Sequence, residues 1–224
     1  MFRSKIRNLI FPQQEHLRLT GAFVLYWGND NFDQPALNFD SFQMGVALHD
    51  WGHGFLDQNE IGAMDAEERL RSMANLVQAQ LPDTTAELVM QHHVLRLMGD
   101  EPMYDQLRHQ LKHRISENIR QVNLDEQDNL DEEIFLRADR ITNLADMISF
   151  DFCFGEPLSR TIPVYAHLGD ETQTDITYSV ADGVIQLNPW PLQVDSLNGY
   201  MLAYEADGYP IDLKPHVVAY KITN

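Results

Sequence analysis

The spacing of apolar residues changes near residue 155, and this change constrains the fold more than any other feature of the chain. Up to that point apolar residues recur at the three- and four-residue intervals of amphipathic helices. After it, short alternating runs are separated by Gly, Pro, Asp and Asn, which is typical of strands and turns. The pattern predicts a mainly α protein, with a helical domain over residues 1–155. A small C-terminal antiparallel β subdomain, residues 156–224, is expected to pack on it.

Local signals place the expected elements. Asp65 and Glu68 have the spacing of a capping box, and Thr84 and Glu87 repeat it. About six helices are expected, starting near Pro12, Asp40, Asp65, Thr84, Pro102 and Asp131. Strands are expected at Ile162–His167, Ile176–Ser179, Gly183–Leu187, Tyr200–Tyr204 and Val217–Ile222, as a meander or small sandwich.

The charge balance restricts the partners. Sixteen Lys and Arg residues stand against 34 Asp and Glu, for a formal net charge of −18. Such a protein repels duplex nucleic acid and anionic membranes unless it has a local basic patch, and no such patch is visible, so neither is an expected partner. The sequence has no apolar run long enough to span a bilayer and no secretory signal, and its single cysteine, Cys153, cannot form an internal disulfide. A cytoplasmic protein is therefore expected.

Four residues of the helical part, His16, His49, Asp50 and Asp146, are candidate metal ligands. Imidazole nitrogens and carboxylate oxygens are both common ligands of divalent metals. Asp146 lies in a strongly apolar helix, where a carboxylate is costly to bury unless something neutralises it. The spacing leaves an alternative open, in which Asp146 pairs with an arginine such as Arg140 and the histidines are ordinary helix-end residues.

His53 follows the His-Asp pair closely enough to share its site. A continuing helix would put His53 on the same face as His49, four residues earlier. Gly52 and Gly54 indicate instead that the helix ends there, which leaves the direction of the His53 side chain open.

Two further histidine pairs differ in their expected surroundings. His92 and His93 are adjacent on an expected helix and point about 100° apart, so one of them can face the centre of the domain. The pattern does not choose between them. His109 and His113 lie on the polar face of their helix and are expected in solvent.

The order H…HD…D, carried by His16, His49, Asp50 and Asp146, resembles that of the HD-domain superfamily of metal-dependent phosphohydrolases. More specifically, the chain resembles an uncharacterised, domain-of-unknown-function branch of that superfamily over most of its length. The matching segments are residues 14–16, 46–52, 146–150 with Cys153, and the Asn-Pro-Trp-Pro run at 188–191. This resemblance implies an HD-type helical bundle. It also implies a divalent metal ion, such as Fe, Mn, Mg, Ni or Zn, held by those four residues.

The resemblance further implies a metal-dependent hydrolase of a small molecule, with phosphoesters as one substrate class. Many members have a lysine in an HD-x-G-K pattern that helps to hold phosphate, and His53 stands in its place here. Asp50, His53 and His93 are the catalytic candidates, with His92 as the alternative to His93. The competing interpretations are an HD-type di-iron oxygenase and a non-catalytic binding module. One metal is favoured over two; in a two-metal site Asp50 would bridge the ions.

Overall fold

The computed structural model describes residues 1–53, 60–126 and 129–224, and it is 46% helical and 22% strand. The main helices are α1 (Gln13–Leu25), α2 (Phe39–Ala47), α3 (Ala66–Gln78), α4 (Thr84–Met98), α5 (Asp105–Glu126) and α6 (Glu132–Phe154). Two short 3₁₀ helices are η1 (Trp51–His53) and η2 (Pro102–Tyr104). The strands are β1 (Phe2–Arg3), β2 (Leu9–Phe11), β3 (Leu158–Val164), β4 (Thr174–Ala181), β5 (Val184–Asn188), β6 (Ser196–Glu205) and β7 (Pro215–Thr223).

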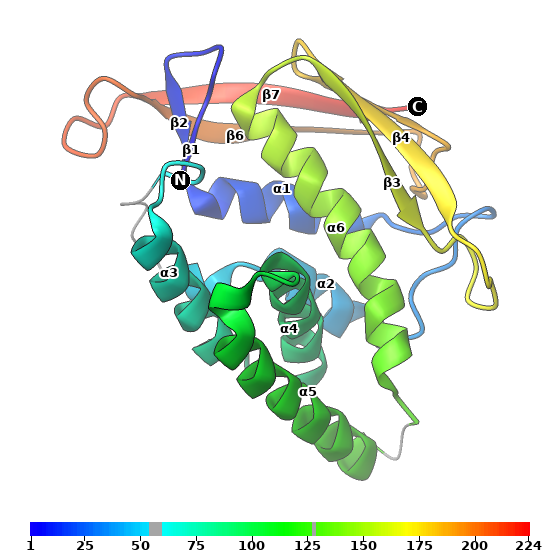
Figure 1. Ribbon diagram of the computed structural model, residues 1–224. Helices are drawn as coiled ribbons and strands as arrows, with labels where there is room; N and C mark the ends of the chain where they lie inside the picture. Colours follow the sequence, from blue (N-terminus) through cyan, green and yellow to red (C-terminus); the bar gives the residue numbers. More distant parts are fainter. Residues whose placement is uncertain (54–59, 127–128) are drawn as a thin grey trace.

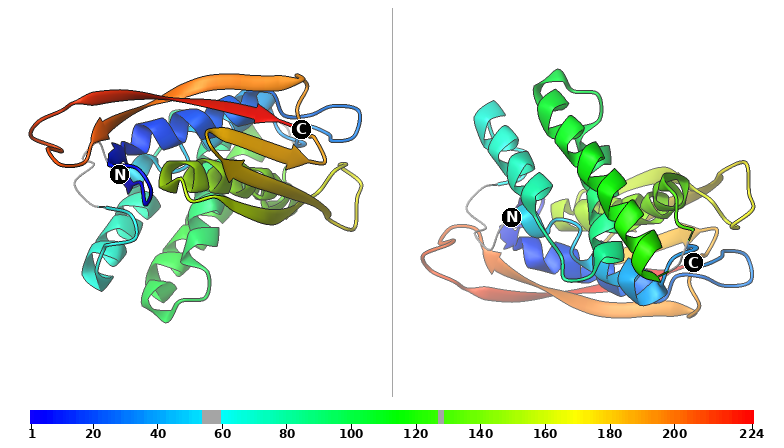
Figure 2. Two further views of the ribbon diagram at one scale, coloured as in Figure 1. Left: turned by 90° about the horizontal axis from the view of Figure 1, so that it is seen from above. Right: turned by 90° about the horizontal axis from the view of Figure 1, so that it is seen from below.

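The strands form one curled sheet. Its order is β1-β2-β6-β7-β5-β4-β3, and it has the shape of a half-barrel. β5 and β7 run parallel, whereas the other neighbours are antiparallel. The sheet curls around α1 and α6, while α3, α4 and α5 lie on the side away from it (Figures 1 and 2).

The predicted helical bundle with a small C-terminal antiparallel β subdomain is wrong. The sheet has seven strands and is mixed, and two of its strands come from the N-terminus. Leu9 and Ile10 of β2 pair with Glu205 and Tyr204 of β6. Two- and three-residue strands are too short to show an alternating pattern, and β6, the strand that joins β2 to the rest of the sheet, lies almost a full chain length away. The C-terminal segments expected to be strands do overlap β3 to β7.

Helix starts follow local capping, with two shifts from expectation. The capping box of Asp65 and Glu68 is present at α3, and Asp131 caps α6 as expected. At α4 the cap is Asp83 rather than Thr84, and at α2 it is Asn38 rather than Asp40. α2 ends at Ala47, so the His-Asp pair lies in the turn that follows the helix. Gly54 lies outside the described residues.

Close packing between helices brings the candidate residues together. A Cβ on Gly45 of α2 would come within 2.6 Å of the Val89 side chain on α4, so the glycine permits this approach. Ser149 of α6 donates a hydrogen bond to the His16 carbonyl oxygen of α1 at 3.0 Å.

In the described part of the chain, no helix combines the length and apolar character needed to cross a membrane.

Candidate metal centre

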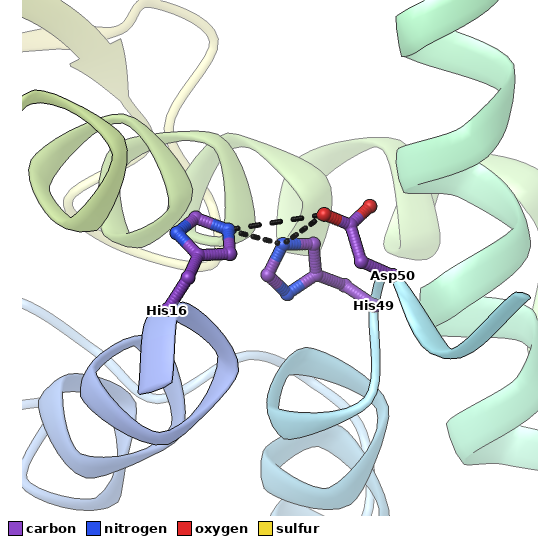
Figure 3. A group of neighbouring side chains, drawn as sticks. All are labelled: His16, His49 and Asp50. Carbon is purple, nitrogen blue, oxygen red and sulfur yellow. Dashed lines mark hydrogen bonds and ion pairs between the residues drawn. The ribbon is translucent and has the colours of Figure 1, made fainter. Parts of the chain in front are cut away.

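Three segments deliver the four candidate ligands to one place in the interior. His16 lies on α1, His49 and Asp50 lie in the turn between α2 and η1, and Asp146 lies on α6. All four are buried, with exposed fractions of 7% or less. Figure 3 shows the His16 and His49 rings and the Asp50 carboxylate directed toward one another.

The ligand atoms lie at distances that suit one metal ion. His16 Nε2 is 3.1 Å from His49 Nε2, 3.3 Å from Asp146 Oδ1 and 3.9 Å from Asp50 Oδ2. His49 Nε2 is 3.6 Å from Asp50 Oδ2 and 3.7 Å from Asp146 Oδ1. Ligands placed about 2.1 Å from a common ion lie about 3 to 4 Å from each other. Two overlapping buried groups could therefore hold a metal ion: His16 with His49 and Asp50, and His49 with His93 and Asp146.

A backbone hydrogen bond orients the His49 ring. Its Nδ1 lies 2.7 Å from the Val46 carbonyl oxygen, which only accepts, so Nδ1 carries a proton and donates it. Nε2 is then the nitrogen available as a ligand, and it is the one that faces His16 and the two carboxylates. An imidazole anchored in this way through its far nitrogen is the usual arrangement for a metal-binding histidine.

The electrostatics of the centre favour positive charge beside the two carboxylates. Burial alone would raise the pKa of Asp50, yet the nearby His49 and His53 hold it well below its usual range. Burial likewise opposes ionisation of Asp146, but hydrogen bonds from His16 and His49 lower its pKa. Burial lowers the pKa of His49, but the Asp50 and Asp146 carboxylates outweigh that effect and raise it to about 9. Two buried carboxylates thus require positive charge, which a protonated His49 or a divalent ion would supply.

The second oxygen of Asp50 faces two other histidines. His93 Nε2 lies 3.2 Å from Asp50 Oδ1, and His53 Nε2 lies 3.6 Å from the same oxygen. Arg96 donates to His93 Nδ1 at 2.7 Å, so the His93 Nε2 proton is the one directed at Asp50. Burial lowers the pKa of both His53 and His93, which favours their neutral forms.

His53 is held firmly despite the neighbouring glycine. Its Nδ1 lies 2.5 Å from Ser72 Oγ on α3. A Cβ at Gly52 would lie 2.4 Å from Leu76 Cα, so the absence of a side chain there lets η1 pack directly on α3. The glycine therefore fixes this turn against a helix and positions His53 beside Asp50.

The other residues considered from the sequence lie away from the ligand cluster. His92 Nδ1 donates to the Leu88 carbonyl oxygen, and its ring stacks on Phe135. His109 and His113 are exposed. Arg140 donates to the Pro163 carbonyl oxygen, so the arginine beside Asp146 is Arg96, at 3.6 Å, and not Arg140.

A cavity opens beside Asp50 between α1 and α2. Its volume is about 550 Å³. Its walls are formed by Gln13, Gln14, Leu17, Arg18, Gly21, Ala22, Gln43, Ala47, Leu48, Asp50 and Trp51. The candidate ligand Asp50 thus reaches a space large enough for a small molecule.

Sequence reasoning missed two residues that touch the cluster. Gln13 Nε2 donates to Asp50 Oδ2 at 2.5 Å, and Arg96 contacts both His93 and Asp146. Each lies three positions from a histidine on the same helix, Gln13 before His16 and Arg96 after His93. That spacing puts them on the same helix faces as those histidines and was the available signal.

Comparison with known protein families matches most of the chain. The model of a family described as "Protein of unknown function (DUF3891)" matches residues 3–204. Neither the curated proteins nor the solved structures include a match to the chain.

Proposed function

We propose that this chain, which belongs to the DUF3891 family, is a metal-dependent hydrolase of a small molecule, with phosphoesters as the first substrate class to test. One observation carries the proposal: ligand atoms of buried His and Asp residues from different segments come together, and one of these residues, Asp50, lines a cavity. The resemblance of His16, His49, Asp50 and Asp146 to the H…HD…D order of HD-domain phosphohydrolases supports it. A divalent ion bound there would polarise a substrate oxygen and lower the pKa of a water molecule.

The donor set favours a transition metal over Mg²⁺. Two imidazole nitrogens and two carboxylate oxygens suit Fe, Mn, Ni or Zn, whereas Mg²⁺ prefers an all-oxygen shell. His16, His49, Asp50 and Asp146 would leave room for water and substrate only on a metal that takes more than four ligands, such as Fe, Mn or Ni. His49, anchored by Val46, and Asp50, held by Gln13 and His93, are positioned for ligation before an ion arrives.

His53 is the acid–base residue in this proposal. Its side chain is 19% exposed, whereas those of the four ligands are 10% exposed or less. Burial lowers its pKa, so the neutral ring can accept a proton at neutral pH. His93 has a positioning role, because its Nε2 proton is donated to Asp50 and its other nitrogen is occupied by Arg96.

A metal-dependent activity assay tests the proposal. Purified protein, stripped with a chelator and reloaded with Mn²⁺, Fe²⁺, Ni²⁺ or Zn²⁺, is assayed with p-nitrophenyl phosphate and bis-p-nitrophenyl phosphate. We expect turnover to require metal and to be abolished in Asp50→Ala with helix content unchanged. The control is His109→Ala, because His109 is exposed on α5. Metal bound by the wild type without turnover of any ester would instead support a binding module.

A two-metal centre is the second candidate, and the orientation of Asp50 favours it. Its Oδ2 faces His16 and His49, while its Oδ1 faces His53 and His93, as a bridging carboxylate would. Against it, Arg96 donates to His93 Nδ1, whereas a His93 bound to metal through Nε2 would carry a proton there. The guanidinium also places positive charge beside His93, which a second cation would need as a ligand.

Metal counting separates the two candidates. The one-metal centre predicts one equivalent per chain in the wild type, and still one in the double variant His53→Ala/His93→Ala. Two equivalents in the wild type, with a loss in that double variant, would overturn the one-metal centre. That result would direct the search toward a dinuclear hydrolase or a di-iron oxygenase, to be tested by dioxygen consumption of the iron-loaded protein.

A further inference from the structure

The cavity beside Asp50 is lined mainly by one face of α1 and one face of α2. Leu17 and Gly21 are four residues apart on α1, and Gln43 and Ala47 are four apart on α2, so each pair shares a helix face. A Cβ on Gly21 would lie 2.8 Å from the Ala47 Cβ, so the two helices touch where these small residues meet. Side chains this small leave the space of about 550 Å³ beside them unfilled.

The accessible walls of this cavity are largely apolar. Leu17, Ala22, Ala47 and Leu48 line it and are half-buried, so part of their carbon surface remains exposed. Trp51 adds an indole ring, and this residue is 41% exposed. Covering apolar surface that would otherwise face water is favourable. The walls therefore favour a ligand with an apolar body.

The charged residues in these walls, among those that the structure describes, are Arg18 and Asp50. The Arg18 guanidinium donates to Glu15 Oε2 at 2.7 Å and to the Tyr200 carbonyl oxygen, and it lies over the Tyr200 ring. Its positive charge is therefore already balanced by Glu15. Asp50 adds a negative charge to the wall, so a second anionic group on a ligand would find no unbalanced cation among the described lining residues.

Asp50 joins the cavity to the candidate metal centre. Its Oδ2 lies 3.9 Å from His16 Nε2 and 3.6 Å from His49 Nε2, and the residue also lines the cavity. A ligand with one anionic group at the metal would extend its other end between α1 and α2. That other end has to suit apolar walls.

From this arrangement we propose that the substrate of the site is a phosphate monoester of an apolar, ring-bearing alcohol. The inference rests on the proposed function, which places the phosphate at the metal. The ring lies among Leu17, Ala22 and Trp51, where the indole offers a flat apolar face. In the hydrolysis, water replaces the alcohol at phosphorus, the bond from phosphorus to the alcohol oxygen breaks, and the proton lost by water ends on that oxygen.

Phosphonates, which cannot be hydrolysed in this way, test the binding preference apart from turnover. Isothermal titration calorimetry on the full chain loaded with Mn²⁺ compares propylphosphonate, 3-phenylpropylphosphonate and the para-carboxylate of the latter. We expect the phenyl group to tighten binding about tenfold or more, because it covers apolar wall. The added carboxylate should remove most of that gain, because it would lose its hydration without gaining a cation.

Two variants locate the ring in the cavity. Ala22→Leu fills part of the space and should weaken 3-phenylpropylphosphonate about tenfold while leaving propylphosphonate little changed. Gln43→Lys adds a cation to the wall and should tighten the para-carboxylate about fivefold. The matched controls are Leu25→Ala, exposed on α1, and Leu124→Lys, exposed on α5; neither residue lines the cavity.

Turnover separates this inference from the proposed function. Ethyl phosphate and 2-phenylethyl phosphate have alcohols of similar acidity, so a lower KM for the second reports the cavity rather than the leaving group. The phosphonate preference without turnover of either ester would support the cavity assignment and contradict hydrolysis. Equal or undetectable phosphonate affinities, a para-carboxylate that binds most tightly to the wild type, or a phenyl preference unchanged in folded Ala22→Leu would overturn the inference, even if both esters are hydrolysed.

Discussion

The Nε2 atoms of His16 and His49 face each other across 3.1 Å in the protein interior. Their rings come from α1 and from the turn after α2, and Asp146 Oδ1 of α6 lies within 3.7 Å of both nitrogens. Two nitrogens and a carboxylate in this arrangement must share either protons or a cation. The metal-free and metal-bound proteins should therefore differ in measurable ways.

Removing a ligand should remove the metal without unfolding the protein. We expect His16→Ala to lower the affinity for Mn²⁺ or Zn²⁺ by at least about 100-fold, since even changes to groups behind metal ligands commonly cost 10- to 100-fold. Calorimetry and elemental analysis measure this, with His113→Ala on the exposed face of α5 as the control. Full metal content in His16→Ala would show that His16 is not a ligand.

The stability of the metal-free protein should depend on pH through His49. Burial lowers its pKa, but Asp50 and Asp146 raise it to about 9, above the value of 6.5 for an unperturbed histidine. A group whose pKa is higher in the folded state stabilises the fold below its unfolded pKa. That contribution is lost as the pH rises from 6.5 through about 9.

Urea unfolding of chelator-treated protein between pH 6 and pH 10 measures this loss as a falling midpoint. With saturating metal the fall should disappear, because a bound ion replaces the proton on His49. The chelator-treated His49→Gln variant, which lacks the titrating group, is the control. A midpoint that does not change with pH in the metal-free wild type would contradict the raised pKa.

A methyl group at Gly52 should disturb the turn that carries His53. Its Cβ would lie 2.4 Å from Leu76 Cα of α3, so η1 must move away from the helix. We expect Gly52→Ala to destabilise the fold by about 1–3 kcal/mol and to lower any metal-dependent turnover more than metal affinity. Thermal and urea unfolding measure the first effect. Gly169→Ala, whose Cβ would have no neighbour within 4 Å, should leave stability unchanged.

The N-terminal strands should contribute to stability as part of the core. Phe2 of β1 is 1% exposed, and the centroid of its ring lies 4.8 Å from the centroid of the His16 ring. We expect Phe2→Ala to lower the free energy of unfolding by about 3–5 kcal/mol, as for other buried phenylalanines. Ile6 is 59% exposed, and Ile6→Ala should change it by less than about 0.5 kcal/mol. Similar effects of the two substitutions would argue against β1 as an integral strand.

The sequence by itself determined the features that depend on neighbouring residues. Asp65 with Glu68, and Asp131, mark the starts of α3 and α6 because capping is a contact over three residues. Alternation after residue 155 located β3 to β7 in outline. Asp146 stood out as a carboxylate in an apolar helix, which is unfavourable without a partner, although the pattern could not name that partner.

Tertiary packing alone decided the rest. The pairing of Leu9 with Glu205 joins the two ends of the chain into one sheet, and no local pattern encodes a contact between residues so far apart. His93 rather than His92 faces Asp50, although both are adjacent on α4, because the packing of α4 against its neighbours sets which of two directions 100° apart points inward. Local interactions define where helices and strands begin, whereas their relative placement depends on long-range contacts that form only when the whole core packs.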